Sequence, residues 1–140
     1  MFQLKRGSLT PEIFNALAEA VGWGHPEITQ VEEALKNSLY TVCIFDNNNF
    51  IAMGRIVGDL SMSYFIKDVA VMPEYQNKGV GRLILTDMLS FIESKTPEGW
   101  KTCIELLSAH GKEGFYEKFG FRKRIKEENG CGMTLIIRFK

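Results

Sequence analysis

Residues 68–85 read DVAVMPEYQNKGVGRLIL and decide the fold: a strand-like run leads through the loop QNKGVGR, residues 76–82, into a helical pattern. A strand that enters a helix N-terminus presents unpaired backbone N–H groups and the positive end of the helix dipole. Glycines at 79 and 81 remove side chains that would keep a ligand from that backbone, and Lys78 and Arg82 add positive charge. The loop therefore suits an anion such as a pyrophosphate.

Two common phosphate-binding loops are excluded by the same residues. A Walker A loop requires G-K-[ST] after its spacer, and the chain contains no such sequence. A dinucleotide-binding fingerprint requires a third glycine, and Ile84 occupies that position.

The rest of the chain predicts a mixed sheet. Apolar and alternating runs predict strands at residues 2–5, 40–45, 50–57, 62–71, 101–107, 121–125 and 133–139. The turn cluster at residues 46–49 predicts an antiparallel hairpin of the second and third strands, and a turn at residues 128–130 is expected between the last two. Helices are expected after Thr10-Pro11, from Thr29 with its capping-box spacing to Glu32, and at residues 80–92 and 112–118. Strand 62–71, helix 80–92 and strand 101–107 form a βαβ unit. We therefore expect an α/β (α+β) fold, with about six to seven strands and about four helices in a single domain of residues 1–140.

Composition narrows the function classes. The 17 basic and 17 acidic residues give a net charge of zero, whereas nucleic-acid-binding proteins usually carry a basic excess. We find neither a membrane-spanning stretch nor a signal peptide, so the expected location is cytoplasmic and no membrane partner is expected. Three widely spaced cysteines predict neither a disulfide framework nor a metal site.

Two motifs in sequence order resemble those of the GNAT superfamily of N-acetyltransferases. Gln76-x-x-Gly79-x-Gly81 is similar to the family's acetyl-CoA-binding pattern Q/R-x-x-G-x-G/A. Residues 114–121, GFYEKFGF, resemble its downstream segment F-Y-x-x-x-G-F. The predicted element order is also similar to the GNAT fold. The resemblance implies acetyl-CoA as cosubstrate, with no metal.

The resemblance also implies roles for residues of this chain. Backbone groups of Val69, Ala70 and Val71 would line the pantetheine arm, and the Val71 N–H would stabilise the oxyanion. The pyrophosphate would be held by backbone amides of Gln76, Asn77, Lys78, Gly79, Val80, Gly81 and Arg82. Tyr116 would face the sulfur of coenzyme A and protonate the departing thiolate; the alternative is a core aromatic residue.

The general base and the acceptor contacts are less specified. Asp68 and Glu105 are the candidate bases, and each has the alternative of a structural carboxylate. Trp23 and His25, between the two early helices, are candidate substrate contacts, because this region commonly forms part of the acceptor pocket in GNAT proteins. Packing and turn formation are the alternative roles for these two residues.

The expected function is direct transfer of an acetyl group from acetyl-CoA to a primary amine of a small molecule, in a ternary complex. Two alternatives stay open: an N-acetyltransferase acting on proteins or peptides, and a GNAT-fold sensor that binds an acyl-CoA without turnover. GNAT proteins are often dimers, so a homodimer is expected from the resemblance. The sequence does not identify the acceptor.

Overall fold

The structure is a computed structural model that describes residues 1–139. The chain divides into two compact units, Met1–Leu106 and a second unit that begins at Leu107. No helix among residues 1–139 combines the length and the apolar character needed to cross a membrane.

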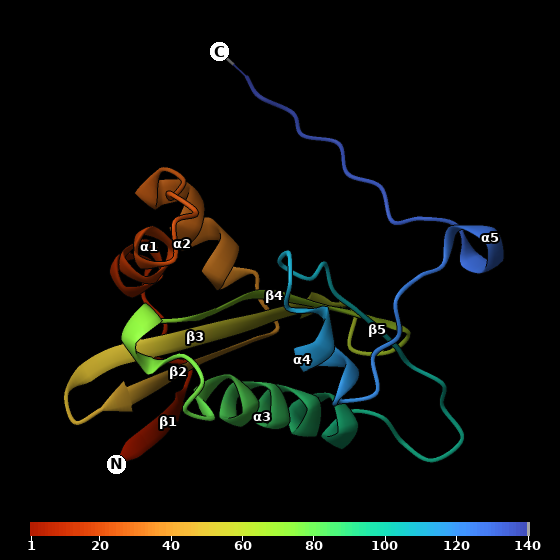
Figure 1. The fold of residues 1–140 in the computed structure, drawn as a ribbon, viewed down its shortest axis with the longest axis horizontal. Coiled ribbons are helices and arrows are strands. Elements are labelled where there is room, and N and C mark those ends of the chain that lie inside the picture. The colour runs from red at the N-terminus through yellow and green to blue at the C-terminus, as the bar shows by residue number, and fades with distance from the viewer. Residues whose placement is uncertain (140) are drawn as a thin grey trace. The chain divides into compact units, whose positions relative to one another are not determined.

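The first unit contains a five-stranded sheet in the order β1-β2-β3-β4-β5 (Figure 1). Its strands are β1 (Phe2–Arg6), β2 (Tyr40–Asp46), β3 (Asn49–Gly58), β4 (Ser63–Val71) and β5 (Cys103–Glu105). The first four strands pair antiparallel, whereas β4 and β5 pair in parallel. The predicted hairpin, the mixed sheet and the parallel βαβ unit are therefore confirmed.

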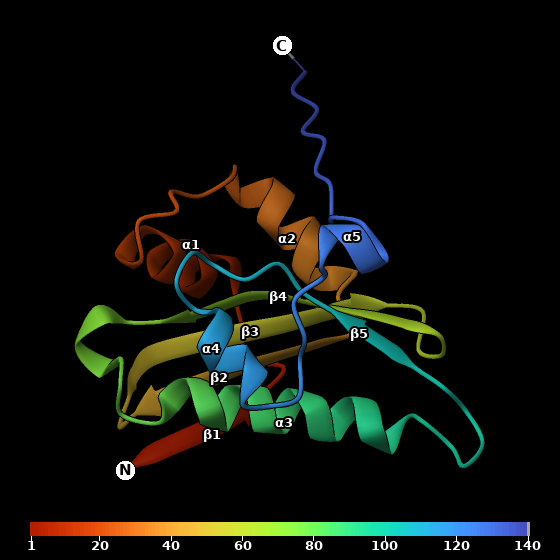
Figure 2. The ribbon, with the colours of Figure 1, turned by 45° about the vertical axis from the view of Figure 1, so that its right-hand side comes forward.

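Helices cover both faces of this sheet. In Figures 1 and 2, α1 (Pro11–Ala20) and α2 (Ile28–Lys36) lie on one face and α3 (Val80–Ser94) lies on the other. Side chains of α1 and α2 pack on sheet residues Cys43, Met53 and Ala70 in a buried cluster. This arrangement buries the apolar stripe of each helix and both faces of the central strands.

The first helix begins as its sequence predicts, and the second does not. Thr10 caps α1, because its side-chain hydroxyl accepts from the backbone N–H of Ile13 at 3.2 Å, and Pro11 follows at the first helical position. In α2, by contrast, Glu27 is the N-cap residue and Thr29 already lies inside the helix. The capping-box assignment is wrong because the helix starts two residues earlier than that pattern indicates.

The second unit contains two short helices, α4 (Glu113–Glu117) and α5 (Lys126–Asn129). Neither predicted strand 121–125 nor predicted strand 133–139 forms there, and β5 is shorter than the predicted 101–107. The described chain therefore has five strands instead of six to seven, and five α-helices instead of four. Residues Lys126–Asn129 form a helical turn where the sequence predicts a turn between two strands. Glu127 and Glu128 favour this helix start, because acidic side chains stabilise a helix N-terminus.

Candidate functional site

The link between β4 and α3 is fixed to the hairpin beside it. Residues Pro73–Tyr75 form a short 3-10 helix, η1, directly after β4. The Met72 N–H donates to the Ile51 carbonyl of β3 at 2.8 Å, and the Tyr75 hydroxyl donates to Asp46 at 2.9 Å. These contacts hold the entry to the loop 76–82 against the β2–β3 hairpin.

The backbone of this loop takes the left-handed conformation twice. Asn77 has φ 63° and Gly79 has φ 82°. Gly79 is the N-cap of α3, and no side chain among the described residues caps this end. The first hydrogen bond of the helix runs from the Leu83 N–H to the Gly79 carbonyl, at 3.2 Å. The N–H groups of the first helical residues, Val80, Gly81 and Arg82, therefore precede the intrahelical ladder and are available to a ligand.

Exposed basic side chains and open space surround the loop 76–82. Lys78 and Arg82 are exposed at the loop, and the Lys78 ammonium lies 5.5 Å from the centre of the Tyr75 ring. A Cβ placed on Gly79 would meet no atom within 4 Å, so the backbone can be approached there. The first turn of α3, within the described chain, carries no acidic residue. The site therefore combines free donors with positive charge, which fits a pyrophosphate.

The edge of β4 is open where it leads into the loop. β4 pairs with β5 only from Ser63 to Phe65, although it continues to Val71. Because the Met72 N–H faces β3 and successive N–H groups alternate in direction, the Val71 N–H faces away from β3. The Val71 carbonyl, on the same side, accepts from the Gln76 side chain at 3.1 Å. The open edge can therefore pair with an extended ligand.

Helix α3 lies close to β3 at one point. A Cβ on Gly54 would lie 2.7 Å from the Met88 sulfur and 2.9 Å from the Ile84 Cγ2 atom. Any side chain at this position would therefore displace Met88 and Ile84, and glycine lets the helix approach the sheet as closely as it does.

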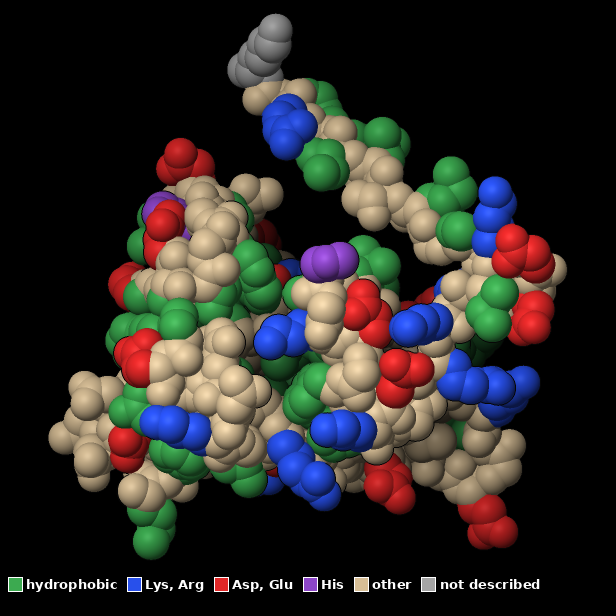
Figure 3. Space-filling view, viewed as in Figure 1, with side chains coloured by type: hydrophobic (Ala, Val, Ile, Leu, Met, Phe, Trp, Pro, Cys, Tyr) green, Lys and Arg blue, Asp and Glu red, His purple; other side chains and the backbone are tan. Residues whose placement is uncertain are grey.

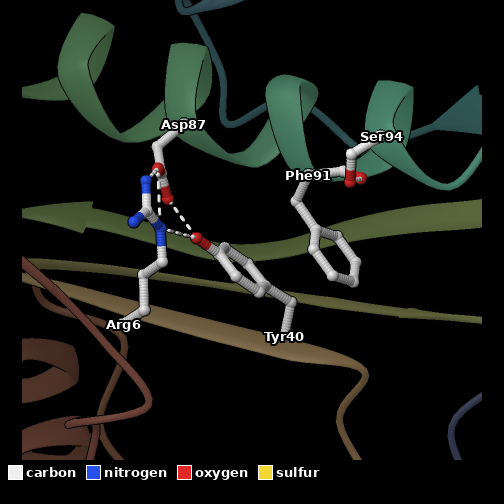
Figure 4. Close-up of polar contacts among 5 residues, drawn as sticks. All are labelled: Arg6, Tyr40, Asp87, Phe91 and Ser94. Atoms are coloured by element: carbon white, nitrogen blue, oxygen red, sulfur yellow. Dashed lines mark hydrogen bonds and ion pairs between the residues drawn. The ribbon is translucent and has the colours of Figure 1, made fainter.

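A polar cluster joins the same helix to β1 and β2 (Figure 4). The Asp87 carboxylate, only 7% exposed, accepts from Arg6 Nη2 at 2.5 Å, from Arg6 Nε at 3.1 Å and from the Tyr40 hydroxyl. Burial and the neighbouring Asp87 raise the pKa of Tyr40 to about 12. The Tyr40 ring also stacks on Phe91, with centroids 4.3 Å apart. The sequence shows Asp87 only as an acidic residue among apolar positions of the helix, which gave no reason to single it out.

Asp68 lies at an irregularity of β4. Its φ is 53°, and the register between β3 and β4 shifts beside it. Its carboxylate accepts from Arg55 Nε at 2.5 Å, and the two side chains are 15% and 19% exposed for Arg55 and Asp68 respectively. The sequence predicts a role for Asp68 but none for Arg55, whose only signal is that of a lone arginine in the apolar run of β3.

Glu105 is exposed at the end of β5, opposite Phe65 in the parallel register. Asp68 and Glu105 thus belong to neighbouring strands. Glu105 is in the last β4–β5 pair, and Asp68 follows that pair on β4. Both predicted carboxylates therefore lie in the part of the sheet where the pairing of β4 with β5 ends.

Trp23 and His25 lie in the loop between α1 and α2. Trp23 is 49% exposed, and its backbone N–H donates to the Ala18 carbonyl at 2.9 Å. His25 Nε2 lies 3.5 Å from Glu19 Oε1, and its Nδ1 lies 3.0 Å from the Pro26 carbonyl oxygen. Both side chains are exposed, and the local turn is held by the backbone N–H of Trp23 and by the side chain of His25.

Tyr116 belongs to the second unit, in α4. Its ring makes edge contacts with Phe115 and Phe121, with centroids 5.1 and 6.1 Å away. Burial raises the pKa of the Tyr116 hydroxyl above its ordinary value. The phenol is therefore protonated at neutral pH and available as a proton donor.

Charge on the surface is mixed. Figure 3 shows both basic and acidic side chains on the face that it presents. Among residues 1–139, no three His, Cys, Asp or Glu residues are grouped as metal ligands would be. The absence of a metal stays a prediction.

The site thus consists of an open strand edge that leads into an amide-rich loop at a helix N-terminus, within an α/β fold. Comparison with known proteins identifies the family. The family model of the acetyltransferase (GNAT) domain matches residues 36–123, more than half of the chain. The chain therefore belongs to the GNAT superfamily of N-acetyltransferases.

Curated relatives agree with this family. An uncharacterized ycf52-like N-acetyltransferase of Prochlorococcus marinus is 30% identical over 75% of this chain and 58% of its own length. GCN5-related N-acetyltransferase 1, chloroplastic, of Arabidopsis thaliana is 27% identical over 98% of this chain and 68% of its own length. The chain thus spans less than two thirds of the Prochlorococcus relative.

Solved structures share the fold over nearly the whole chain. The protein of unknown function SA2161 from Staphylococcus aureus has a TM-score of 0.85 and 27% identity, covering 96% of this chain and 100% of its own. The GNAT family protein SP0256 from Streptococcus pneumoniae has a TM-score of 0.81 and 27% identity, covering 99% and 100%. These likenesses confirm the predicted fold family.

Proposed function

We propose that this chain transfers the acetyl group of acetyl-CoA to the primary amine of a small molecule by direct attack in a ternary complex. The observation that carries the proposal is the open edge of β4, which continues into the free amides at the start of α3. An extended pantetheine arm followed by a pyrophosphate matches that sequence of donors: strand edge first, helix N-terminus second.

The residues would divide the binding of acetyl-CoA between them. Backbone groups of Val69 and Val71 pair with the arm, and the amides of residues 76–82 hold the pyrophosphate. Ala70 contributes its side chain to the core beneath, because Ala70 is 3% exposed and belongs to the cluster under α1 and α2. Lys78 and Arg82 supply positive charge at the rim of the site.

The bound thioester supplies an activated acyl group. The amine nitrogen forms a bond to the carbonyl carbon, the carbon–sulfur bond breaks, and the thiolate takes a proton from the Tyr116 hydroxyl. The proton that the nitrogen then loses to become an amide returns the Tyr116 phenolate to its phenol, directly or through water. The Val71 N–H stabilises the oxyanion that develops on the carbonyl. A carboxylate, Glu105 or Asp68, accepts the proton that the ammonium form of the acceptor must lose, directly or through water.

A paired substitution tests the binding part of this proposal. Gly79 and Gly99 both have positive φ, of 82° and 88°, and a Cβ on either would meet no atom within 4 Å. Alanine at either position therefore carries a similar backbone strain, but only Gly79 lies in the loop. We expect Gly79→Ala to raise the dissociation constant of acetyl-CoA about tenfold in calorimetry, and Gly99→Ala to leave it within about twofold. Equal affinities for the two variants would overturn the assignment of the loop.

A screen of acceptors tests the reaction. Release of free coenzyme A is followed with polyamines, amino sugars, amino acids, arylamines and peptides, and the acetylated product is identified by mass spectrometry. Transfer to a small amine supports the proposal, and transfer to peptides alone favours the protein N-acetyltransferase. Tight binding of acetyl-CoA without transfer to any acceptor favours the sensor. Light scattering of the same preparation tests the predicted homodimer.

A further inference from the structure

At the irregularity beside Asp68, the side chains of β4 exchange the two faces of the sheet. In the register with β3, Lys67 is opposite Arg55 and Ala70 is opposite Met53. β4 therefore advances three residues while β3 advances two, so β4 contains one extra residue, as in a β-bulge. Asp68 takes up this extra residue with its left-handed φ of 53°.

The bulge inverts the faces of the strand. Before it, Ile66 is opposite Ile56, which shares a face with Gly54 beneath α3. After it, Ala70 belongs to the buried cluster under α1 and α2. Because side chains and amides alternate with a period of two, a strand without the extra residue would turn Ala70, instead of Val71, towards the open edge. The conformation of Asp68 therefore determines which amides a ligand on that edge meets.

Arg55 holds this conformation through two contacts. Its Nε donates to Asp68 Oδ2 at 2.5 Å, and its Nη1 donates to Ser38 Oγ at 3.3 Å. Ser38 Oγ in turn donates to the Ala34 carbonyl in the last turn of α2, at 2.8 Å. Both side chains of the ion pair are at least four-fifths buried. The charge of Asp68 is therefore paired with that of Arg55, which Ser38 also holds in place.

We propose that Arg55 is a positioning residue for acyl transfer: by anchoring Asp68 in the bulge, it directs the Val69 and Val71 amides to the acyl-CoA arm. Asp68 is then the anchor of the bulge, which leaves Glu105 as the carboxylate that accepts the proton of the amine. This inference rests on the proposed function, because it assigns the open edge to acetyl-CoA.

Substitutions at Asp68 separate the two roles. Asparagine keeps an oxygen acceptor for Arg55 and tolerates a positive φ; glycine tolerates the φ without an anchor; alanine has neither property. For an anchor we expect kcat/KM to fall about threefold in Asp68→Asn, about tenfold in Asp68→Gly and about a hundredfold in Asp68→Ala. The acidic limb of the pH–rate profile should be unchanged in Asp68→Asn.

Substitutions at Arg55 test the partner. Arg55→Met leaves the carboxylate without its donor and should lower kcat/KM about a hundredfold, whereas Arg55→Lys should recover part of the loss by restoring a single donor. In the double variant Arg55→Met with Asp68→Asn, the two effects should be less than additive, because they remove one interaction. Circular dichroism shows which variants fold, and Asp68→Asn with Arg55→Lys carries the test if the others do not.

Two results would overturn the proposal. Equal losses in Asp68→Asn and Asp68→Ala, with the acidic limb of the pH profile abolished, would make Asp68 the base. Folded Arg55→Met with activity and affinity within about twofold of the parent would remove Arg55 from any positioning role.

Coenzyme A binding distinguishes failure of this inference from failure of the proposed function. If the parent chain acetylates no amine, the dissociation constant of coenzyme A still reports on the edge amides. The order parent, Asp68→Asn, Asp68→Gly, Asp68→Ala, from tightest to weakest, would support the anchor without any turnover. Equal affinity across the four would reject it. Amide chemical shifts of Val69 and Val71, compared between the parent and Asp68→Ala, report the same reorientation directly.

Discussion

Tyr116 is the residue whose proposed role depends most on a single atom. Burial raises the pKa of its hydroxyl, so the hydroxyl retains its proton at neutral pH. Removing that oxygen in Tyr116→Phe keeps the aromatic contacts of α4 and should lower kcat about a hundredfold or more, with the affinity for acetyl-CoA unchanged. Steady-state kinetics and calorimetry measure the two quantities.

Tyr64 provides the matched control for this change. The Tyr64 hydroxyl is buried and has no hydrogen-bond partner within the described chain, so Tyr64→Phe removes an oxygen that makes no bond. We expect activity within about twofold of the parent for Tyr64→Phe. A Tyr116→Phe variant with the same activity as Tyr64→Phe would leave Tyr116 as an aromatic packing residue.

Asp87 is predicted to affect stability more than chemistry. Its carboxylate accepts from both Arg6 and Tyr40, and it is the buried member of the cluster in Figure 4. Asp87→Ala should lower the free energy of unfolding by about 2 kcal/mol, because hydrogen bonds to a charged group are lost and Tyr40 is left without its acceptor. Urea denaturation measures the change. Thr86→Ala, at an exposed position of the same helix, is the control and should change stability by less than about 0.5 kcal/mol.

At the residue level, the sequence predicts what depends on local backbone. Gly79 and Gly81 could be assigned to the loop because their role follows from conformations that glycine allows and from the helix that follows them. Arg55 could not be assigned, because its partner Asp68 comes from another strand and the pairing depends on a register shift. A bulge is a property of two strands together, and one sequence shows only the strand that contains it.

Among the secondary structure elements, the packing of α3 on β3 decides where the proposed anion site lies. In Gly54→Ala, the added methyl would overlap Met88 and Ile84 of this helix. The variant should lose about 1–3 kcal/mol of stability and bind acetyl-CoA more weakly, because α3 carries the amides of the loop. Thermal unfolding and calorimetry check both effects. Gly114→Ala is the control: its Cβ would meet no atom within 4 Å, so stability should be kept.

Elements that carry their own signals were predictable, and those that depend on a neighbour were not. The hairpin of β2 and β3 has a turn cluster, and α1 has its cap and proline, so both formed as expected. Residues 133–139 have the composition of a strand, yet they form none in the structure, where their large side chains at Met133 and Phe139 are 94% and 93% exposed. A strand needs a partner for its backbone groups, and composition does not supply one.

For the whole molecule, the proposed roles fall on different residues. The strand edge and the loop are proposed to bind acetyl-CoA, and Tyr116 of α4 is proposed to protonate the thiolate. Binding of acetyl-CoA and turnover are therefore separable properties: substitutions in the loop should act on the first, and substitution of Tyr116 on the second.

The tyrosines predict that the folded chain loses stability at alkaline pH. All four, Tyr40, Tyr64, Tyr75 and Tyr116, have a pKa raised above the ordinary value of about 10, and that of Tyr40 reaches about 12. Burial is the largest cause for three of them, whereas the hydrogen bond to Asp46 is the largest for Tyr75. Burial likewise raises the pKa of Cys43 to about 11. At a pH between the unfolded and the folded pKa of such a group, the folded chain binds more protons than the unfolded chain.

The free energy of unfolding should therefore be constant below about pH 8 with respect to these groups and should fall as the pH rises towards 12. Urea denaturation between pH 8 and 12 measures this slope, and phenolate absorbance of the native chain follows the tyrosines themselves. Tyr40→Phe removes the tyrosine whose pKa is raised to about 12, so the stability of this variant should fall less steeply between about pH 10 and 12 than that of the parent. Parallel curves for the two proteins would mean that Tyr40 titrates normally, and that Asp87 and burial do not hold its proton.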